Sequence, residues 1–478
     1  MKSIILLISL TFFSLTNIIN AQSPDWLWAK GAGGASADEG KDICTDAAGN
    51  VYIVGFFNSP SITFGAVTLT SVGSGDIFIV KYDASGNLMW AKSAGGTSYD
   101  EGNSISTDAS GNVYVGGYFQ SSIIVFGADT LTNEGNMDAF IVKYNSMGNV
   151  VWAKGTGGVG NESVQSLHTD ALGNILLTGY FQSPSIAFGN VILSNAGSKK
   201  GGVAPSLTDY QGSSGSSDVF TAVYDPSGKI LWAKSAGGTS YDFGTGISND
   251  ANGNVYISGY FQSPEITFGN IVLKNAGGTA NTSDIFLVKY DAAGTVVWAK
   301  NCGAASSEEA NSISTDASGN SYITGYFQSP VIDFGITALT NSGSMDIYAA
   351  KYDAQGNAVW AKSASGASYD YGTGISIDAN GNVYVTGYFQ SPTITFGEVV
   401  LTNASKNTTS DIFIVKYDSK GAVVWAKNAG GDDDDESNSI CNGPTGNIHL
   451  TGYFRSSKIS FNGTTLTNAG SGDIFIAN

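Results

Sequence analysis

Positive charge is scarce in this sequence of 478 residues. It holds 22 lysines and arginines but 40 aspartates and glutamates, which gives a formal net charge of -18 at pH 7. A surface that binds nucleic acid is basic, so this charge balance excludes nucleic acid as an expected partner. Cationic partners or metal ions suit an acidic surface better.

Cysteine is also scarce, with three residues at Cys44, Cys302 and Cys441. An odd number of thiols cannot form a complete disulfide framework. The fold must therefore be held together by packing and hydrogen bonds.

Long apolar runs are lacking apart from one near the N-terminus, from Ile4 to Leu15. It falls short of the ~20 apolar residues that a membrane span needs. A basic Lys2 precedes it, and Asn20-Ala21 closes it, which together predict a secretory signal over residues 1–21. The alternative is an uncleaved anchor helix. We expect a secreted or cell-surface protein without a transmembrane span.

Repetition, in contrast, runs through the whole sequence. The tripeptide Trp-Ala-Lys occurs seven times, and successive copies are 62, 62, 80, 66, 62 and 65 residues apart. The copies begin at Trp28, Trp90, Trp152, Trp232, Trp298, Trp360 and Trp425. A unit of this length accommodates four short strands with their turns, so each unit is predicted to be one propeller blade.

The turns within a unit support four antiparallel strands. An Asp three residues before a Gly, as at Asp108 and Gly111, suits a type I turn closed by a residue in the left-handed region. The strand at 76–82 is apolar on both faces, so its sheet must be packed on both sides, as a propeller blade is.

The two ends of the chain predict how the ring closes. Residues 26–30 form a fourth strand with no strands before it, and residues 473–478 form a third strand with no fourth. Pairing them gives an all-β, seven-bladed β-propeller of four-stranded antiparallel blades over residues 22–478, closed by the N-terminal strand. A truncated chain would end in the same way.

In such a ring Cys44 and Cys441 lie in neighbouring blades at equivalent positions. Equivalent side chains point the same way around the ring, and stacked sheets lie ~10 Å apart, beyond the ~7 Å between Cα atoms that a disulfide spans. We therefore expect three free thiols.

The repeat also resembles a known family. The run from Asp108 to Val115, the Gly-Tyr-Phe at 117–119 and the frame from Asp76 to Lys92 are similar to the bacterial seven-bladed β-propeller repeat family. The resemblance extends from about Trp26 to the end. It implies a secreted or cell-surface bacterial protein, similar to surface-layer-like proteins, and it provides no shared catalytic residues.

Function is expected on one face of the ring. The connections from second to third strand and from one blade to the next are long, and strand alternation places both on the same face, where binding residues would lie. A carboxylate occurs five residues before the first-strand Ile or Leu of every unit. These residues are Asp38, Asp100, Glu162, Asp242, Glu308, Asp370 and Asp435. They predict an acidic collar that binds a cation or a basic partner. The alternative is that each carboxylate caps backbone N–H groups.

Two further segments of this face are candidate ligand-binding elements. The third unit has a Gly- and Ser-rich insertion at 198–217, in which Lys199, Lys200 and Tyr210 could contact a partner, although a flexible excursion is the default. The run from Asp432 to Glu436 is the most acidic sector. Asp432, Asp433, Asp434, Asp435 and Glu436 are the candidate ligands of a weakly bound Ca²⁺, no other cofactor being expected.

Few polar residues break the repetition. His168 replaces a Ser or Cys, His449 lies in a second strand, and Arg455, the one arginine, replaces a Gln found in most units. Repeated aromatics such as Trp90 are predicted to pack in the core rather than to stack on sugars. No Ser-His-Asp spacing or His-rich metal motif is present.

Two functional hypotheses remain. The favoured one is an exported, monomeric, non-enzymatic propeller that binds a glycan, a surface polymer or a protein through its long-loop face. The second is a polysaccharide-active enzyme that uses the collar, His168 and the insertion. A quinone-dependent oxidoreductase is disfavoured because those propellers typically have eight blades. The sequence does not identify the ligand.

Overall fold

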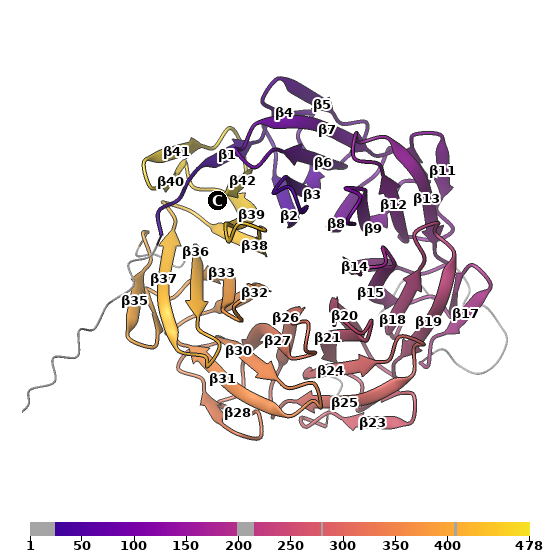
Figure 1. Cartoon of the computed structure of the whole chain (residues 1–478), viewed down its shortest axis with the longest axis vertical. Helices are drawn as coiled ribbons and strands as arrows, with labels where there is room; N and C mark the ends of the chain where they lie inside the picture. Colours follow the sequence, from indigo (N-terminus) through magenta and orange to yellow (C-terminus); the bar gives the residue numbers. More distant parts are fainter. Residues whose placement is uncertain (1–23, 198–214, 279–280, 406–408) are drawn as a thin grey trace, which may run out of the picture.

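The computed structural model describes residues 24–197, 215–278, 281–405 and 409–478. Within these residues the strands form seven antiparallel sheets of four strands and seven two-stranded hairpins. The four-stranded sheets stand around a common axis as the blades of a β-propeller (Figure 1). We number the blades 1 to 7 in the chain order of their first strands.

The first strand of each blade lies innermost, and the fourth lies toward the outside (Figure 1). The first strands are β2 (Asp38–Thr45), β8 (Asp100–Thr107), β14 (Glu162–Thr169), β20 (Asp242–Asn249), β26 (Glu308–Thr315), β32 (Asp370–Ile377) and β38 (Asp435–Asn442). The second strands are β3 (Val51–Phe57), β9 (Val113–Phe119), β15 (Ile175–Phe181), β21 (Val255–Phe261), β27 (Ser321–Phe327), β33 (Val383–Phe389) and β39 (Ile448–Phe454).

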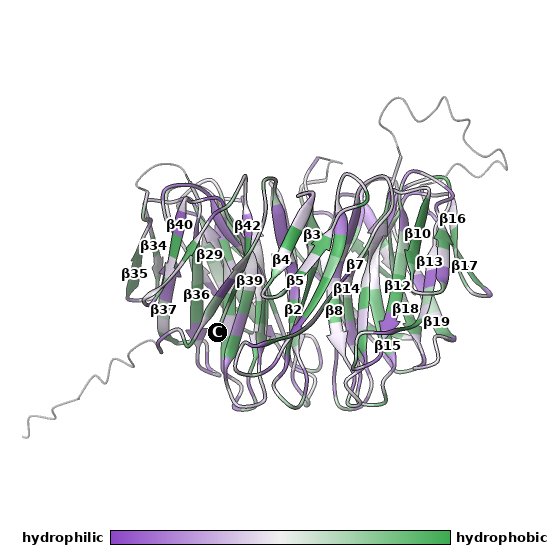
Figure 2. Ribbon diagram, turned by 90° about the horizontal axis from the view of Figure 1, so that it is seen from above, coloured by the Kyte–Doolittle hydropathy of each residue, from purple (hydrophilic) through white to green (hydrophobic). Residues whose placement is uncertain are grey.

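The third strands are buried on both sides, as their apolar composition requires. They are β6 (Asp76–Tyr82), β12 (Asp138–Tyr144), β18 (Asp218–Tyr224), β24 (Asp284–Tyr290), β30 (Asp346–Tyr352), β36 (Asp411–Tyr417) and β42 (Asp473–Ala477). The fourth strands are β7 (Leu88–Ala94), β13 (Val150–Thr156), β19 (Ile230–Ala236), β25 (Val296–Cys302), β31 (Ala358–Ala364), β37 (Val423–Ala429) and β1 (Ala29–Ala32). Seen from the side, hydrophobic segments run along the strands (Figure 2).

The predicted turns are present. Gly111 has a φ of 74° and donates its N–H to the carbonyl of Asp108, whose carboxylate accepts the N–H groups of Ser110 and Asn112. A side chain at Gly111 would be strained, because L-residues avoid this region. The Asp-x-x-Gly repeat is therefore a structural device.

The connection between second and third strands differs from the long loop expected. It contains a two-stranded hairpin that lies at the outer rim of the ring (Figure 1). The hairpins are β4 (Ser61–Phe64) with β5 (Val67–Thr70), β10 (Ile123–Phe126) with β11 (Asp129–Thr132), β16 (Ser185–Phe188) with β17 (Val191–Ser194), β22 (Glu265–Phe268) with β23 (Ile271–Lys274), β28 (Val331–Asp333) with β29 (Ala338–Thr340), β34 (Thr393–Phe396) with β35 (Val399–Thr402), and β40 (Lys458–Phe461) with β41 (Thr464–Thr467).

Each hairpin buries alternate side chains against its blade. In β4, Ile62 and Phe64 are buried, whereas Ser61 and Thr63 are exposed. Phe64 packs at 5.2 Å between ring centroids from Phe78 of the third strand. The hairpin thus extends the blade core outward, and it leaves the inner part of the ring to the first and second strands.

The N-terminal strand closes the ring as predicted. β1 pairs antiparallel with β42 in blade 7, with Ala29 opposite Ala477 and Ala32 opposite Ile474. The pairing continues to Leu27, whose N–H donates to the carbonyl of Asn478. No helix in the described part of the chain is long and apolar enough to cross a membrane. All three cysteines are free thiols.

Candidate functional site

The carboxylates of the predicted collar begin the first strands, and all seven are 0% exposed. Each is hydrogen bonded to backbone within its own repeat. Asp38 accepts the N–H groups of Gly34 and Ser59 and the hydroxyl of Ser59, and Glu308 accepts the N–H groups of Ala304 and Ser329. They cap the loop that enters the strand, and no exposed acidic ring is formed. A role in ligand binding stays a prediction, and this burial disfavours it.

A second buried carboxylate begins each third strand and lies near the first. Asp218 fills the space over Gly237, where a Cβ would lie 2.0 Å from its Oδ1 atom. Burial raises the pKa of Asp218 to about 7. Burial and the charge of Asp218 raise the pKa of Asp242, at the start of the next blade, to about 7 despite hydrogen bonds from Ser263. Each blade junction therefore buries two acids.

One aromatic side chain lies one residue before the last Phe of each second strand, and five of these seven, all but Phe56 and Tyr453, are partly exposed. Strand register pairs each of them with the second residue of the adjacent first strand, as Glu101 pairs with Tyr118 and Glu309 with Tyr326. We call these fourteen residues the axial cluster, because they lie on the innermost strands of Figure 1. The pairs are Glu39 with Phe56, Glu101 with Tyr118, Ser163 with Tyr180, Phe243 with Tyr260, Glu309 with Tyr326, Tyr371 with Tyr388, and Glu436 with Tyr453.

Aromatic contacts connect neighbouring blades in the axial cluster. Tyr180 and Phe243 are 4.7 Å apart between ring centroids, and Tyr326 and Tyr371 are 5.1 Å apart. Tyr371 stacks in turn on Tyr388 at 4.9 Å. Their repetition in the sequence predicts that these aromatics are core residues. That holds for the adjacent Phe, whereas Tyr180, Tyr326 and Tyr388 keep part of their surface exposed.

An internal ammonium group occupies the axial cluster between blades 1 and 2. Lys41 Nζ lies 2.8 Å from Glu39 Oε2 and 3.4 Å from Glu101 Oε1, and it lies 5.2 Å from the centre of the Phe56 ring. Burial lowers the pKa of Lys41, but Glu101 and Glu39 outweigh this effect, so the pKa is raised. The site therefore holds a charged ammonium between carboxylates and an aromatic face.

The predicted calcium ligands do not converge on one point. Asp432 accepts the N–H and hydroxyl of Ser457, and Asp435 is buried against Ser456. Asp434 accepts the N–H of Ser410. In the described ranges no group of three or more His, Cys, Asp or Glu side chains is arranged to hold a metal ion. Calcium binding stays a prediction.

His168 lies far from the collar. It is six residues beyond Glu162 on β14, which is about 20 Å along a strand at ~3.3 Å per residue. Burial lowers its pKa, although Asp170 acts in the opposite direction. The enzymatic hypothesis required the collar and His168 together, and the strand separates them. Lys199, Lys200 and Tyr210 lie outside the described residues.

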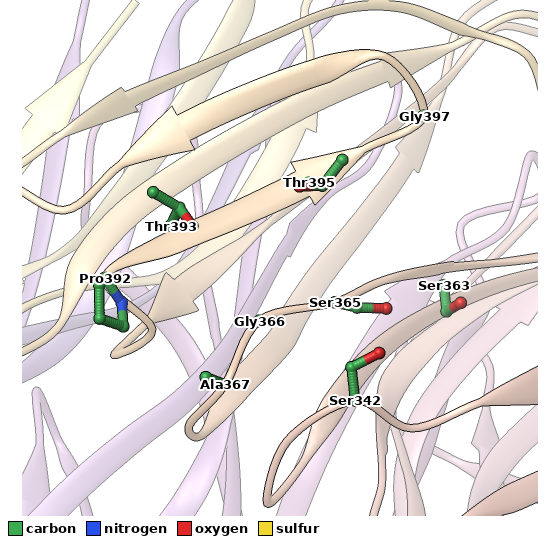
Figure 3. Close-up of a pocket in the computed structure, with 9 residues that line it drawn as sticks. All are labelled: Ser342, Ser363, Ser365, Gly366, Ala367, Pro392, Thr393, Thr395 and Gly397. Carbon is green, nitrogen blue, oxygen red and sulfur yellow. The ribbon is translucent and has the colours of Figure 1, made fainter.

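A groove of about 730 Å³ lies between blade 5 and the outer hairpin of blade 6. Figure 3 shows the hydroxyl groups of Ser342, Ser363 and Ser365 on one side and those of Thr393 and Thr395 on the other. Its lining carries neither charged nor aromatic side chains. The groove offers hydrogen bonds but no reactive group.

Comparisons with known proteins agree with the repeat architecture. Residues 90–118 and 359–388 match the family model described as Beta-propeller repeat (SBBP). The chain is 27% identical to the uncharacterized WD repeat-containing protein L264 of Acanthamoeba polyphaga mimivirus, over 91% of this chain and 36% of that protein. It is 26% identical to the regulatory protein FlaEY of Caulobacter vibrioides, over 24% of this chain and 12% of that protein. The chain thus spans about a third of the viral relative and less of FlaEY.

Solved structures align with most of this chain at low sequence identity. The WD40 propeller domain of Doa1 aligns with a TM-score of 0.46 and 9% identity, covering 95% of this chain and 96% of that one. Sqt1 from Chaetomium thermophilum aligns with a TM-score of 0.36 and 10% identity, covering 95% and 98%.

Proposed function

We propose that this protein is an exported, non-enzymatic binding scaffold of bacterial type, which binds a surface protein or a glycan on the face where its first strands begin. The propeller supplies a rigid frame, and the partly exposed aromatic residues of the axial cluster supply the contact surface. Aromatic side chains contribute large contact areas at low entropic cost, and tyrosine adds a hydroxyl group that can hydrogen bond.

The observation that carries this proposal is the composition of the axial cluster. Seven repeats present nine aromatic and four acidic side chains at the same two strand positions. Tyr326 and Tyr388 are incompletely buried, although the motif that contains them recurs in a buried strand. The relative named for WD repeats supports a protein partner. Export is supported by the signal expected at residues 1–21.

The experiment is a binding screen of the mature chain against a glycan array and against proteins displayed on a cell envelope. We expect replacement of Tyr326 and Tyr388 by alanine to weaken binding at least about tenfold, the effect of about 1.4 kcal/mol. Thr267→Ala, on the exposed side of an outer hairpin, is the matched control and should bind like the wild type. Unchanged binding in the double variant would place the contact surface elsewhere.

The polysaccharide-active alternative is tested in the same screen by measuring reducing ends released from each bound glycan. A binding scaffold releases none. If the wild type releases reducing ends and replacement of Glu308 or Asp370 abolishes this release, the enzymatic alternative replaces the binding scaffold.

A further inference from the structure

Two acids of the axial cluster, Glu39 and Glu101, form ion pairs with an internal ammonium group, whereas Glu309 and Glu436 form no ion pair among the described residues. Glu39 and Glu101 bind Lys41, and Arg455 lies over the ring of Tyr453, the pair of Glu436, while its Nη1 atom lies 3.7 Å from Asp434. The ion pairs among the described residues include none to Glu309.

Glu309 nevertheless has the surroundings that hold Lys41 in blade 1. Its carboxylate is partly exposed and accepts the hydroxyl of Ser283 at 3.2 Å. Burial raises the pKa of Glu309, and the hydrogen bonds to Tyr326 and Ser283 oppose this effect in part. The rings of Tyr326 and Tyr371 pack edge to face beside it. Burial raises the pKa of Tyr260 and Tyr371, and the charge of Glu309 adds to this effect, after Tyr369 in the case of Tyr371. One carboxylate and three phenol rings thus meet between blades 4 and 6.

The repeat explains why no internal side chain supplies the cation here. The position of Lys41 is Asn311 in blade 5, and its amide donates to the carbonyl of Gly372. In blade 4 the same position is Thr245, whose hydroxyl donates to the carbonyl of Ala310. Both side chains are used in contacts between blades, and neither carries charge.

We propose that the site formed by Glu309, Tyr326 and Tyr371 binds the ammonium group of a lysine from a protein partner. The carboxylate supplies a charge-assisted hydrogen bond, and the aromatic rings supply cation–π contacts, the combination that holds Lys41. The net charge of -18 favours the approach of a basic segment. The inference rests on the proposed binding function and assigns its partner to a lysine-bearing protein surface.

The test measures the binding of fluorescein-labelled tetralysine to the mature chain by anisotropy at low salt. We expect Glu309→Gln to weaken binding at least about fivefold, as the loss of a charge-assisted contact predicts. Glu265→Gln removes an exposed carboxylate on an outer hairpin, which pairs at 3.3 Å with Lys274, and should leave binding within about twofold, as for a weak surface pair.

Two further variants separate this site from general attraction to an acidic protein. Asn311→Lys supplies an internal ammonium at the position of Lys41 and should block the peptide, whereas Thr267→Lys adds the same charge on the outer hairpin and should not. Tyr371→Phe keeps the ring and should bind, whereas Tyr371→Leu should not. Thermal unfolding verifies that each variant is folded.

The inference is overturned if tetralysine does not bind, or if Glu309→Gln and Glu265→Gln weaken binding equally. A glycan or protein that binds the wild type and Glu309→Gln alike would leave the binding function standing and reject the lysine site.

Discussion

The indole nitrogen of Trp298 donates a hydrogen bond of 3.1 Å to the carbonyl of Ala354 in the next blade. The same indole covers Gly356, which has a φ of 77°. Trp90, Trp232 and Trp360 make equivalent hydrogen bonds to the following blade. The tryptophan of the Trp-Ala-Lys motif therefore latches four blades to the following one through a hydrogen bond.

The latch predicts the effect of a methyl group at Gly356. A Cβ there would lie 2.9 Å from the Trp298 ring, so Gly356→Ala should destabilise the protein by about 2 kcal/mol or more through backbone strain and displacement of the indole. The measurement is the free energy of unfolding in denaturant. Gly335→Ala is the control, since Gly335 also has a positive φ but nothing within 4 Å. Equal losses would mean that the indole contact contributes little.

Removal of the closing strand should affect the whole ring. Deleting residues 24–32 exposes the edge of β42, so we expect aggregation or a large fall in the melting temperature. Trp26→Ala removes the ring contacts to Phe461 and to the ammonium of Lys427, each at 5.1 Å, but keeps the strand pairing and should cost far less. If the truncated protein has the same melting temperature as the full chain, closure of the ring by β1 is refuted.

The buried acids predict that stability falls as pH rises. The folded-state pKa values of Asp218 and Asp242 are raised to about 7 from ordinary values near 4, so the folded state holds more protons between these limits. The stabilising effect of protonation is complete below about pH 4 and is lost as the pH rises through about 7. We expect a higher melting temperature at pH 5 than at pH 8.

Asp218→Asn supplies the control for this pH dependence. The amide oxygen can still accept the N–H of Ala196, while the repulsion of Asp242 is removed. The free energy of unfolding of the variant should exceed that of the wild type by at least about 1 kcal/mol at pH 8, which is close to the free energy of a shift by one pKa unit. At pH 5 the two proteins should differ little. Identical pH profiles for the two proteins would show that this pair is not the source.

The three thiols should react slowly in the native protein. Burial raises the pKa of Cys44, Cys302 and Cys441, so little of the reactive thiolate is present at neutral pH. Intact-mass measurement after alkylation should show three modified sites in denaturant and fewer under native conditions. One modified site in denaturant without reductant would reveal a disulfide.

Weak Ca²⁺ binding at the acidic run from Asp432 to Glu436 is tested by calorimetric titration. We expect heat of binding and a rise in melting temperature, both lost when the five carboxylates are neutralised together. Because Asp435 is already bonded to Ser456 and Asp432 to Ser457, the competing result is no heat at all. That result would leave these residues as caps.

The repeat length and the turn sequences are sufficient to predict the fold. Asp108 and Gly111 fix the geometry of one turn, Trp-Ala-Lys marks the fourth strand of a blade, and the same motifs recur in the other repeats. The outer hairpins were missed because strands such as Ser61–Phe64 are too short to give a clear alternating pattern. The axial cluster was missed because Tyr118 and Phe119 are adjacent in one motif, and only strand register shows that one is buried and the other faces Glu101. That alternation, with a Glu as the second residue of the first strand, was the available signal.

The pairing of Ala29 with Ala477 also concerns the order of folding. The two residues are 448 positions apart in the chain. Each doubling of the loop length adds only about 0.6 kcal/mol to the entropic free-energy cost of closing the loop. The larger consequence is kinetic, because contacts of such sequence separation form slowly. During synthesis β1 exists long before its partner strand, so blade 7 can only be completed after the chain has been made to its last strand. Closure of the ring by the pairing of β1 with β42 is thus a late step of folding.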